Sequence, residues 1–332
     1  MLRVLFAGTP ECAVPSLEAL ARAHRVVAVL TNPPAPAGRS GTPVPSPVEA
    51  AARHLIAEGA IEGETPIIAP EKLNDAVRAE IARARPDIMA CFAYGKIFGP
   101  KTLALFPLGA VNLHPSLLPR WRGCAPVPAA ILARDRETGV TVQRMALEMD
   151  SGDVIAQTRI PLDGTETAES LLARAAVLGA PLLVDTINRF ERGPVEGTPQ
   201  NESLATYCAM LRKEDGEIDW KRSAAEIDAK IRAYEPWPGA FTVAGGNTLA
   251  IHKAHVHAES PAQCGAARAI PGSIVGVDKK AGILVQTGDG TLALETLQWR
   301  TKKALDFKSF LNGTRNFPDL ILGQNGTEGR KP

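Results

Sequence analysis

An amide, an imidazole and a carboxylate stand in this sequence where apolar segments give way to loops that contain proline or glycine. Asn112 and His114 lie on either side of Leu113 at the end of an apolar run, and Asp150 precedes a Ser-Gly pair. Because alternate residues of a strand share one face, Asn112 and His114 can reach the same reacting atom. Such strand ends are where open α/β enzymes keep their chemistry.

These three residue types suit the transfer of a formyl or acyl group to an amine. A neutral His114 can take the proton that the attacking amine loses, and Asn112 can donate a hydrogen bond to the oxyanion that develops. Asp150 can orient the imidazole and influence its protonation. No serine or cysteine nucleophile is needed, because the amine itself attacks. The residues alone also fit plain scaffolding, with Asp150 as the cap of a turn.

The segment after His114 has the composition of a turn. Pro115 denies the sheet a backbone donor and ends the strand, and residues 116–119 then carry backbone groups that must find partners. A bound heterocycle could supply those partners. A rigid turn without a ligand is the alternative interpretation.

The first part of the chain alternates apolar strand patterns with amphipathic helix patterns, which predicts an α/β fold with a mostly parallel, Rossmann-like sheet. The tripeptide Gly8-Thr9-Pro10 after the first strand is not a dinucleotide-binding fingerprint and is best explained as a tight turn. Strands are predicted at 2–7, 26–30, 65–69, 87–93, 111–113, 140–145 and 154–160, the last antiparallel, and helices at 14–24, 47–58, 71–84, 125–134 and 167–189.

The second part has a different pattern, a helix at 224–234 followed by five short strands with glycine turns. These strands are expected at 241–243, 249–257, 272–277, 282–286 and 291–298. They predict a small β-barrel of the oligonucleotide-binding (OB) kind, and the same pattern also fits an SH3-like barrel or a β-sandwich. The expected organisation is a catalytic domain at 1–192, a linker at 193–205 and an OB-like domain at 206–325.

Bulk properties are consistent with two domains in one chain of 332 residues, since 45% hydrophobic residues can fill two cores. Residues 1–205 hold 20 Lys/Arg and 22 Asp/Glu, whereas 206–332 hold 17 and 14, so the small basic excess lies in the second part. An excess of this size leaves a polyanionic partner open. The five cysteines lack a Cys-x-x-Cys pair, and neither a disulfide framework nor a metal site is expected. Without a signal peptide or an apolar run near 18 residues, a cytoplasmic protein without a membrane span is expected.

The chain closely resembles the methionyl-tRNA formyltransferases, within the folate-dependent formyltransferases. The resemblance rests first on residues 112–126, 138–141 and 149–153. It extends, in order, to 6–10, 36–39, 45–48, 93–95, 218–220, 236–238, 287–290 and 302–303, which is nearly the whole chain.

The resemblance implies an enzyme that moves the formyl group of 10-formyltetrahydrofolate to the α-amine of methionyl initiator tRNA, with the formyltransferase fold and no metal. Asn112, His114 and Asp150 would be its catalytic residues. The folate would be held by residues 116–119 and by the backbone of the 92–97 loop. The cofactor-binding residues implied in this way are Ser116, Leu117, Leu118, Pro119, Phe92, Tyr94 and Gly95.

The resemblance also implies contacts to the tRNA acceptor stem. A proline-rich loop at 32–47 carries Arg39 where the family has its key arginine, but the two lysines usual after it are replaced by 40–42, so this contact is less charged here. Lys302 and Lys303 would meet phosphates from the barrel domain. Residues 121–123 are expected to form a wall on the substrate side. A monomer is expected.

Two other functions fit part of the same evidence. A formyltransferase for a small amine, such as a nucleotide-linked amino sugar or glycinamide ribonucleotide, would share the three catalytic residues. A non-catalytic RNA-binding protein with a degenerate enzyme domain would not need them intact.

Overall fold

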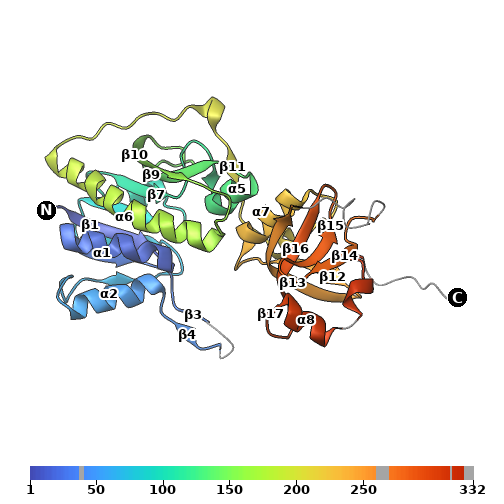
Figure 1. Ribbon diagram of the computed structural model, residues 1–332. Helices are drawn as coiled ribbons and strands as arrows, with labels where there is room; N and C mark the ends of the chain where they lie inside the picture. The colour runs from blue at the N-terminus through green and yellow to red at the C-terminus, as the bar shows by residue number, and fades with distance from the viewer. Residues whose placement is uncertain (37–40, 259–268, 315, 325–332) are drawn as a thin grey trace. The chain divides into compact units, whose positions relative to one another are not determined.

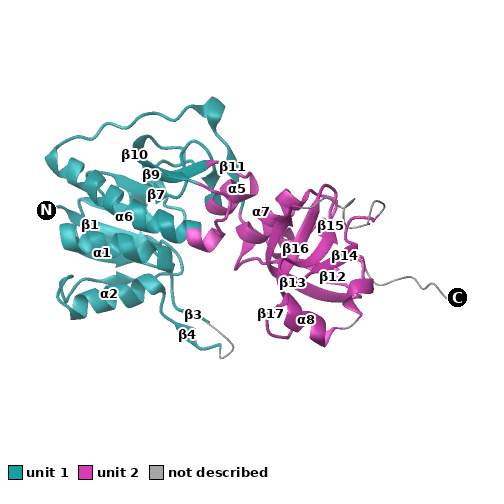
Figure 2. Cartoon of the chain, viewed as in Figure 1, with its two compact units in different colours: residues 1–126, 137–161, 171–209 teal, residues 127–136, 162–170, 210–332 magenta. Residues whose placement is uncertain are grey.

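The first strand and helix of the chain build the start of a parallel sheet. In the computed structural model, which describes residues 1–36, 41–258, 269–314 and 316–324, strand β1 (Arg3–Gly8) leads through α1 (Val14–Ala23) to β2 (Arg25–Leu30), which pairs with β1 in parallel (Figure 1). The chain divides into two compact units, shown in Figure 2: residues 1–126, 137–161 and 171–209, and residues 127–136, 162–170 and 210–332.

Unit 1 contains a seven-stranded sheet in the order β10-β9-β7-β6-β1-β2-β5. The pairs among β1, β2, β5, β6 and β7 are parallel, whereas β9 and β10 add antiparallel strands at one edge. The prediction of a mostly parallel α/β sheet is therefore confirmed. The strands not yet given are β5 (Ile67–Ile68), β6 (Ile88–Phe92), β7 (Ala110–His114), β9 (Glu137–Arg144) and β10 (Val154–Pro161).

Helices follow the strands where the sequence provides caps. Ser46 accepts a hydrogen bond from the backbone N–H of Glu49 and starts α2 (Pro47–Ala57), with proline at the first position, where its missing N–H costs nothing. Asn74 caps α3 (Asp75–Arg83) in the same way through Val77. The other helices of the first 192 residues are α4 (Pro100–Leu103), α5 (Pro126–Leu132) and α6 (Ala168–Arg192).

The two faces of the sheet are covered by different helices. On one face, Leu5, Met89 and Ala110 pack with Ile81 of α3 in one buried cluster. On the other face Leu113 of β7 meets α6 so closely that a Cβ on Gly179 would lie 2.5 Å from its Cδ2 atom. Since side chains alternate along a strand, Asn112 and His114 lie on the face of Ala110, opposite Leu113.

Helix α6 corrects one expectation. By length and composition alone it could cross a membrane, because an 18-residue window has a mean hydropathy of 1.5, whereas the sequence analysis found no such stretch. In this fold 44% of that window is buried, and the contact of Gly179 with Leu113 shows that an apolar side of the helix packs on the sheet. Packing on the sheet thus accounts for part of its apolar character.

Several short elements escaped the sequence analysis. The 32–47 loop contains a two-stranded hairpin, β3 (Ala35–Pro36) with β4 (Pro43–Val44). Strand β8 (Arg122–Gly123) pairs in parallel with β11 (Tyr207–Cys208), which ties the segment after α6 to unit 1. Two-residue strands carry no periodicity that a sequence pattern can show.

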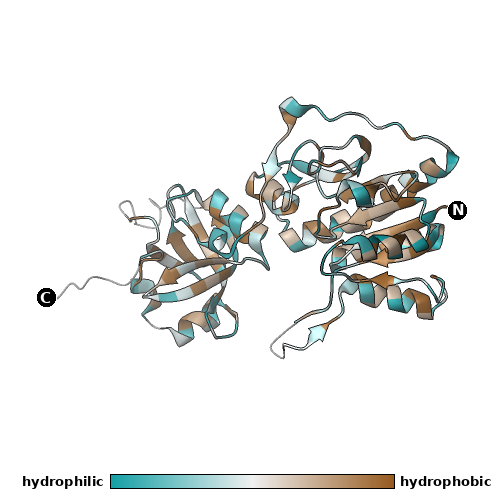
Figure 3. Cartoon of the chain, turned by 180° about the vertical axis from the view of Figure 1, so that it is seen from behind, coloured by the Kyte–Doolittle hydropathy of each residue, from teal (hydrophilic) through white to brown (hydrophobic). Residues whose placement is uncertain are grey.

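Unit 2 contains an antiparallel sheet in the order β12-β13-β16-β15-β14, with β17 (Leu305–Asp306) beside β16. All five predicted strands and the helix α7 (Ala224–Tyr234) are present, and Figure 3 shows the hydrophobic residues concentrated along the strands. The strand pairings among the described residues do not join β12 to β14, so they define an antiparallel sheet and not a closed barrel. The strands are β12 (Ala240–Ala244), β13 (Asn247–His257), β14 (Ile274–Asp278), β15 (Gly282–Gln286) and β16 (Thr291–Trp299).

A short α-helix in unit 2 was missed by the sequence analysis. Helix α8 (Phe307–Gly313), capped by Asp306, buries Phe310 against Phe317 in an edge-to-face contact with ring centroids 4.9 Å apart. The helix is only seven residues long, too short for its apolar spacing to be distinguished from that of a loop.

Candidate active site

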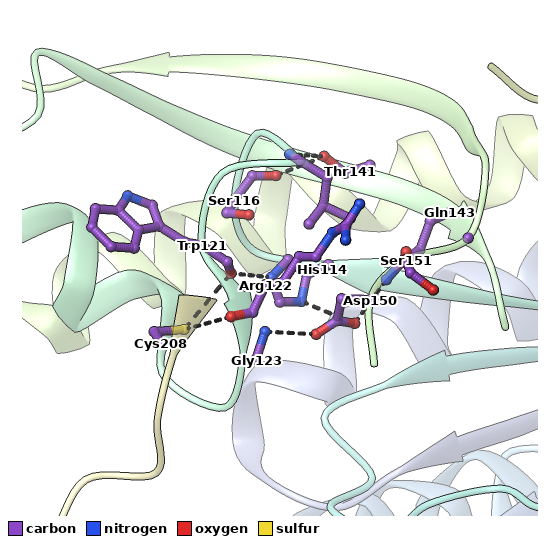
Figure 4. A network of polar contacts seen from close by, with 12 residues as sticks. His114, Ser116, Trp121, Arg122, Gly123, Thr141, Gln143, Asp150, Ser151 and Cys208 are labelled. Atoms are coloured by element: carbon purple, nitrogen blue, oxygen red, sulfur yellow. Dashed lines mark hydrogen bonds and ion pairs between the residues drawn. The ribbon is translucent and has the colours of Figure 1, made fainter. Parts of the chain in front are cut away.

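The imidazole of His114 lies between a backbone carbonyl and a carboxylate. Its Nε2 atom is 2.8 Å from the carbonyl oxygen of Trp121, and its Nδ1 atom is 3.6 Å from Oδ1 of Asp150 (Figure 4). A carbonyl oxygen can only accept a hydrogen bond, so Nε2 carries the hydrogen. Nδ1, on the Asp150 side, is therefore the nitrogen able to accept a proton in the neutral ring. The ring is almost fully buried, with 4% of its residue surface exposed.

The carboxylate of Asp150 is held by donors from two other elements. Gly123 of β8 donates its backbone N–H to Oδ2 at 2.9 Å, and the side chain of Gln143 in β9 donates to Oδ1 at 2.7 Å. These bonds come from outside the turn at residues 151–152, so Asp150 is not merely its cap. Its backbone has a φ of +54°, a left-handed conformation that aspartate tolerates better than most residues.

Asn112 lies on the same sheet face as His114, two residues before it in β7, and is paired across the sheet with Cys91 and Gln143. Its residue surface is partly exposed, and among the described residues its carboxamide has no hydrogen-bond partner. A carboxamide in this state can donate to an incoming oxygen without first breaking another bond. The structure thus places Asn112 and His114 on one face and brings Asp150 to the imidazole.

Cys91 is the thiol beside Asn112, and its burial disfavours the thiolate that a nucleophile needs. Burial raises the pKa of Cys91 to about 12, with a smaller contribution from the charge of Asp150. The thiol is therefore protonated near neutral pH, and only a thiolate attacks efficiently. The site offers acid–base and hydrogen-bonding groups, as direct attack by an amine requires.

The segment 116–119 already has internal hydrogen-bond partners. The Thr141 hydroxyl donates to the carbonyl of Ser116 at 2.6 Å and accepts from the N–H of Leu118 at 3.2 Å. Gln157 donates to the carbonyl of Leu118 at 2.9 Å, and the N–H of Thr206 to the carbonyl of Pro119 at 3.2 Å. The side chain of Leu117 packs on Gly139, where a Cβ would lie 2.4 Å from it. The fold itself therefore satisfies groups for which the sequence analysis had suggested a ligand.

The loop after β6 turns sharply where the sequence analysis expected cofactor contacts. Phe92 and Tyr94 are buried in the core, whereas Gly95 has a φ of +85°, a conformation that favours glycine. The carbonyl of Tyr94 accepts hydrogen bonds from the Thr9 hydroxyl and the Asn32 amide, at 3.1 and 3.0 Å. Since the two aromatic side chains belong to the core, Phe92 and Tyr94 would meet a ligand at this loop through their backbone.

Two of the three residues expected to contact tRNA lie among the described residues. Lys302 and Lys303 are exposed in unit 2, between β16 and β17. Arg39 falls within 37–40 and lies outside the described residues.

Gln143 and Gln200 escaped the sequence analysis, and the contacts of Arg122 differ from those it expected. Arg122 is buried to 1% exposure and makes a two-pronged ion pair with Glu202, whose pKa it lowers. The sequence analysis expected a substrate-side wall at 121–123, but Arg122 faces its protein partners. A register of β7 against β9 would have revealed Gln143 opposite Asn112, but a single sequence does not give strand register.

Comparisons with known proteins agree with this fold. The formyl transferase family model matches residues 2–187, and the model of the formyl transferase C-terminal domain matches 210–315. A solved N-formyltransferase from Helicobacter canadensis, in complex with folinic acid and dTDP-3-aminofucose, has a TM-score of 0.62 at 20% identity, covering 90% of this chain and 100% of that one. A methionyl-tRNA formyltransferase structure from Clostridium thermocellum has a TM-score of 0.53 at 16% identity, covering 77% and 94%.

Fold and sequence together make this chain a formyltransferase, an enzyme that transfers a formyl group. A methionyl-tRNA formyltransferase of Treponema denticola is 50% identical over 322 residues, which are 97% of this chain and 99% of the relative. The chain belongs to the methionyl-tRNA formyltransferase family.

Proposed function

We propose that this enzyme transfers the formyl group of 10-formyltetrahydrofolate to the α-amine of methionyl initiator tRNA. The observation that carries the proposal is the 50% identity, over 97% of the chain, to a relative of that name. The position of Asp150 beside the imidazole of His114, with Asn112 on the same sheet face, supports it because this reaction needs a base and an oxyanion donor but no protein nucleophile.

In the proposed reaction the amine nitrogen attacks the formyl carbon, and a new C–N bond forms. The carbonyl oxygen becomes an oxyanion, to which the free carboxamide of Asn112 donates a hydrogen bond. His114 takes the amine proton at Nδ1, since Nε2 is already bonded to the Trp121 carbonyl. The Asp150 carboxylate stabilises the resulting imidazolium, which assists Asn112 at the oxyanion. The bond from carbon to the folate nitrogen then breaks, and that nitrogen receives the proton.

The folate would lie between two segments, Ser116–Leu117–Leu118–Pro119 and the loop with Phe92, Tyr94 and Gly95. A buried Asn32 Oδ1 atom, without a hydrogen-bond partner among the described residues, lies in the same side chain that binds the Tyr94 carbonyl and supports a polar ligand at this loop. Because the backbone of 116–119 is internally bonded, that segment would contribute mainly apolar contact.

The tRNA would be shared between the two parts of the chain. We propose a catalytic domain at 1–192, a linker at 193–205 and an OB-like domain at 206–325 that meets phosphates through Lys302 and Lys303, with Arg39 reaching the acceptor stem. The antiparallel strands of unit 2 and the exposure of both lysines support this. Because one chain would supply both parts, a monomer would suffice. We place this monomer in the cytoplasm.

A formylation assay tests the proposal directly. Purified enzyme is given 10-formyltetrahydrofolate with methionyl initiator tRNA, or with dTDP-3-aminofucose or glycinamide ribonucleotide. We expect turnover with the tRNA and a loss of about 10²- to 10⁴-fold in kcat for His114→Ala, with folate binding retained in calorimetry. Turnover on a small amine alone, or an active His114→Ala, would contradict it.

Loss of charge at the two lysines tests the tRNA contact. In Lys302→Gln/Lys303→Gln the slope of log Kd for tRNA against log salt should become shallower by about 0.7 to 0.9 for each phosphate contact removed. An unchanged slope would contradict a role for this pair.

A further inference from the structure

A line of hydrogen bonds continues from the catalytic carboxylate to the segment that follows α6. Gln143 donates to Oδ1 of Asp150 at 2.7 Å, and its own carbonyl oxygen faces the amide nitrogen of Gln200 at 3.3 Å. The carbonyl oxygen of Gln200 accepts from Nε of Arg122 at 2.9 Å. Thus Gln200, which is far from Asp150 in the sequence, is linked through Gln143 to the carboxylate that faces His114.

The two ends of this line leave each carboxamide only one orientation. A guanidinium has only donors and a carboxylate only acceptors. Gln200 must therefore turn its oxygen toward Arg122, and Gln143 must turn its nitrogen toward Asp150. If Gln200 were reversed, its oxygen would face the oxygen of Gln143, and if Gln200 were lost, the oxygen of Gln143 would lose its partner and the carboxamide would be held only at its Asp150 end.

Gln200 also holds the backbone of the catalytic turn. Its amide nitrogen also donates to the carbonyl of Asp150 at 2.8 Å and to the carbonyl of Gly152 at 2.7 Å, so one of its two hydrogens is shared with the longer contact to Gln143. The turn is tight, because a Cβ on Gly152 would lie 1.9 Å from the carbonyl oxygen of Arg144, and Asp150 has a left-handed backbone. A single side chain therefore bonds both sides of Ser151 and stabilises a backbone conformation that is otherwise unfavourable.

Arg122 fixes Gln200 from the other side. Its guanidinium is buried and bonds both carboxylate oxygens of Glu202 at 2.9 and 2.7 Å and the hydroxyl of Tyr207 at 3.1 Å. Its backbone N–H donates to the carbonyl of Thr206 at 2.8 Å. The segment 200–208 is thus attached to β8, the same short strand from which Gly123 donates to Asp150.

We propose that Gln200, oriented by Arg122, is a positioning residue for the formyl transfer, which sets the carboxylate of Asp150 against His114. Gln200 need not contact either substrate. Its part in catalysis rests on the proposed function, whereas its effect on the Asp150–His114 pair does not.

The decisive variant is Gln200→Met, which keeps the length of the side chain and removes all of its hydrogen bonds. Gln286→Met is the matched control, because Gln286 is a glutamine whose amide likewise donates to carbonyls of a turn, at Thr287 and Gly290, but in unit 2. Should Gln200→Met fail to fold, Gln200→Glu replaces it, since it keeps an acceptor for Arg122 and loses both donors.

Two measurements are made on each variant. The first is steady-state formylation across pH, for which we expect kcat of the Gln200 variant to fall about 10- to 100-fold with both KM values nearly unchanged, and the midpoint of its acid limb to move. A partly unfolded enzyme would lower kcat equally at every pH. The second is the pH titration of the ¹⁵N-labelled His114 imidazole, assigned by its disappearance in His114→Gln, which requires no turnover.

The inference predicts a shifted His114 titration in the Gln200 variant and an unshifted one in Gln286→Met. It is overturned if the Gln200 variant titrates like the unaltered enzyme, or if the two variants lose kcat equally. If the unaltered enzyme formylates no methionyl-tRNA, the proposed function fails, and the His114 titration still decides whether Gln200 positions the pair.

Discussion

Substitution of Asp150 by asparagine tests the central pair of the site with almost no change in shape. Both carboxylate oxygens accept hydrogen bonds, from Gly123 at 2.9 Å and from Gln143 at 2.7 Å. An asparagine has one acceptor and one donor group there, so its NH₂ must face one of those donors. The loss of one hydrogen bond to a charged group should lower the free energy of unfolding by about 1.5 to 3 kcal/mol.

The effect on rate follows from the charge. At the observed 3.6 Å between His114 Nδ1 and Asp150 Oδ1, the carboxylate attracts an imidazolium by about 4 to 5 kcal/mol at an effective dielectric constant near 20. The Asp150 side chain is 13% exposed, so water screens part of this attraction. We therefore expect kcat of Asp150→Asn to fall by about 10²- to 10³-fold.

Three assays separate these effects: single-turnover formylation, folate binding by calorimetry, and urea unfolding. Asp278→Asn is the control, because it removes the charge of a carboxylate that accepts two hydrogen bonds, from backbone N–H groups to Oδ1 at 2.7 and 2.6 Å, on a turn of unit 2. The control should keep kcat, and because an asparagine Oδ1 can still accept both N–H groups, it should lose less stability than Asp150→Asn. A kcat for Asp150→Asn within tenfold of the unaltered enzyme, or a fall in kcat matched by the control, would refute the reasoning.

Three further predictions concern packing, pH and thiols. Gly179→Ala should lower the free energy of unfolding in urea by up to about 2 kcal/mol, because a Cβ 2.5 Å from Leu113 overpacks the contact at a cost greater than the gain in helix propensity from glycine to alanine. Additive effects of Gly179→Ala and Leu113→Ala on this free energy would contradict the prediction. Burial lowers the pKa of His24 below its ordinary 6.5, with Glu191 opposing, so below pH 6.5 the unfolded chain binds a proton that the native state resists. As the pH decreases below 6.5, the free energy of unfolding should therefore decrease by at most about 1.4 kcal/mol per pH unit, and His24→Phe should remove this contribution. Parallel curves of unfolding free energy against pH for the two proteins would contradict it. Iodoacetamide at pH 8 should alkylate exposed Cys124 and spare Cys91, whose pKa burial raises to about 12, until urea is added; early labelling of Cys91 in peptide mass spectra would contradict this.

Elements with a clear period were predictable from the sequence, and very short ones were not. The patterns at 26–30 and 224–234 each became the expected strand or helix, because five to eleven residues are enough to show an apolar run or a helical period. The hairpin of β3 with β4 and the pair of β8 with β11 have two residues per strand, and their partners lie up to 85 positions apart in the chain. Only the folded backbone brings such strands together.

The chemistry of the site was readable from residue types, but its geometry was not. The spacing of Asn112 and His114 predicted a shared face, since the period of a strand is two. Two of the groups that orient the imidazole and the carboxylate are backbone atoms, the carbonyl of Trp121 and the N–H of Gly123. Nearly every residue carries the same backbone groups. A sequence cannot single out a backbone atom that any other residue would also provide.

The same argument explains why Gln200 escaped notice. A glutamine at the end of a stretch with two glycines and two prolines is ordinary linker composition. Its significance arises because buried Arg122 accepts no hydrogen bond and Asp150 donates none, so that the two carboxamides between them each have one orientation. Directionality of this kind belongs to the whole chain of hydrogen bonds. Removing one carboxamide should therefore alter the catalytic carboxylate two side chains away, whereas the loss of an equivalent turn-binding glutamine such as Gln286 should not.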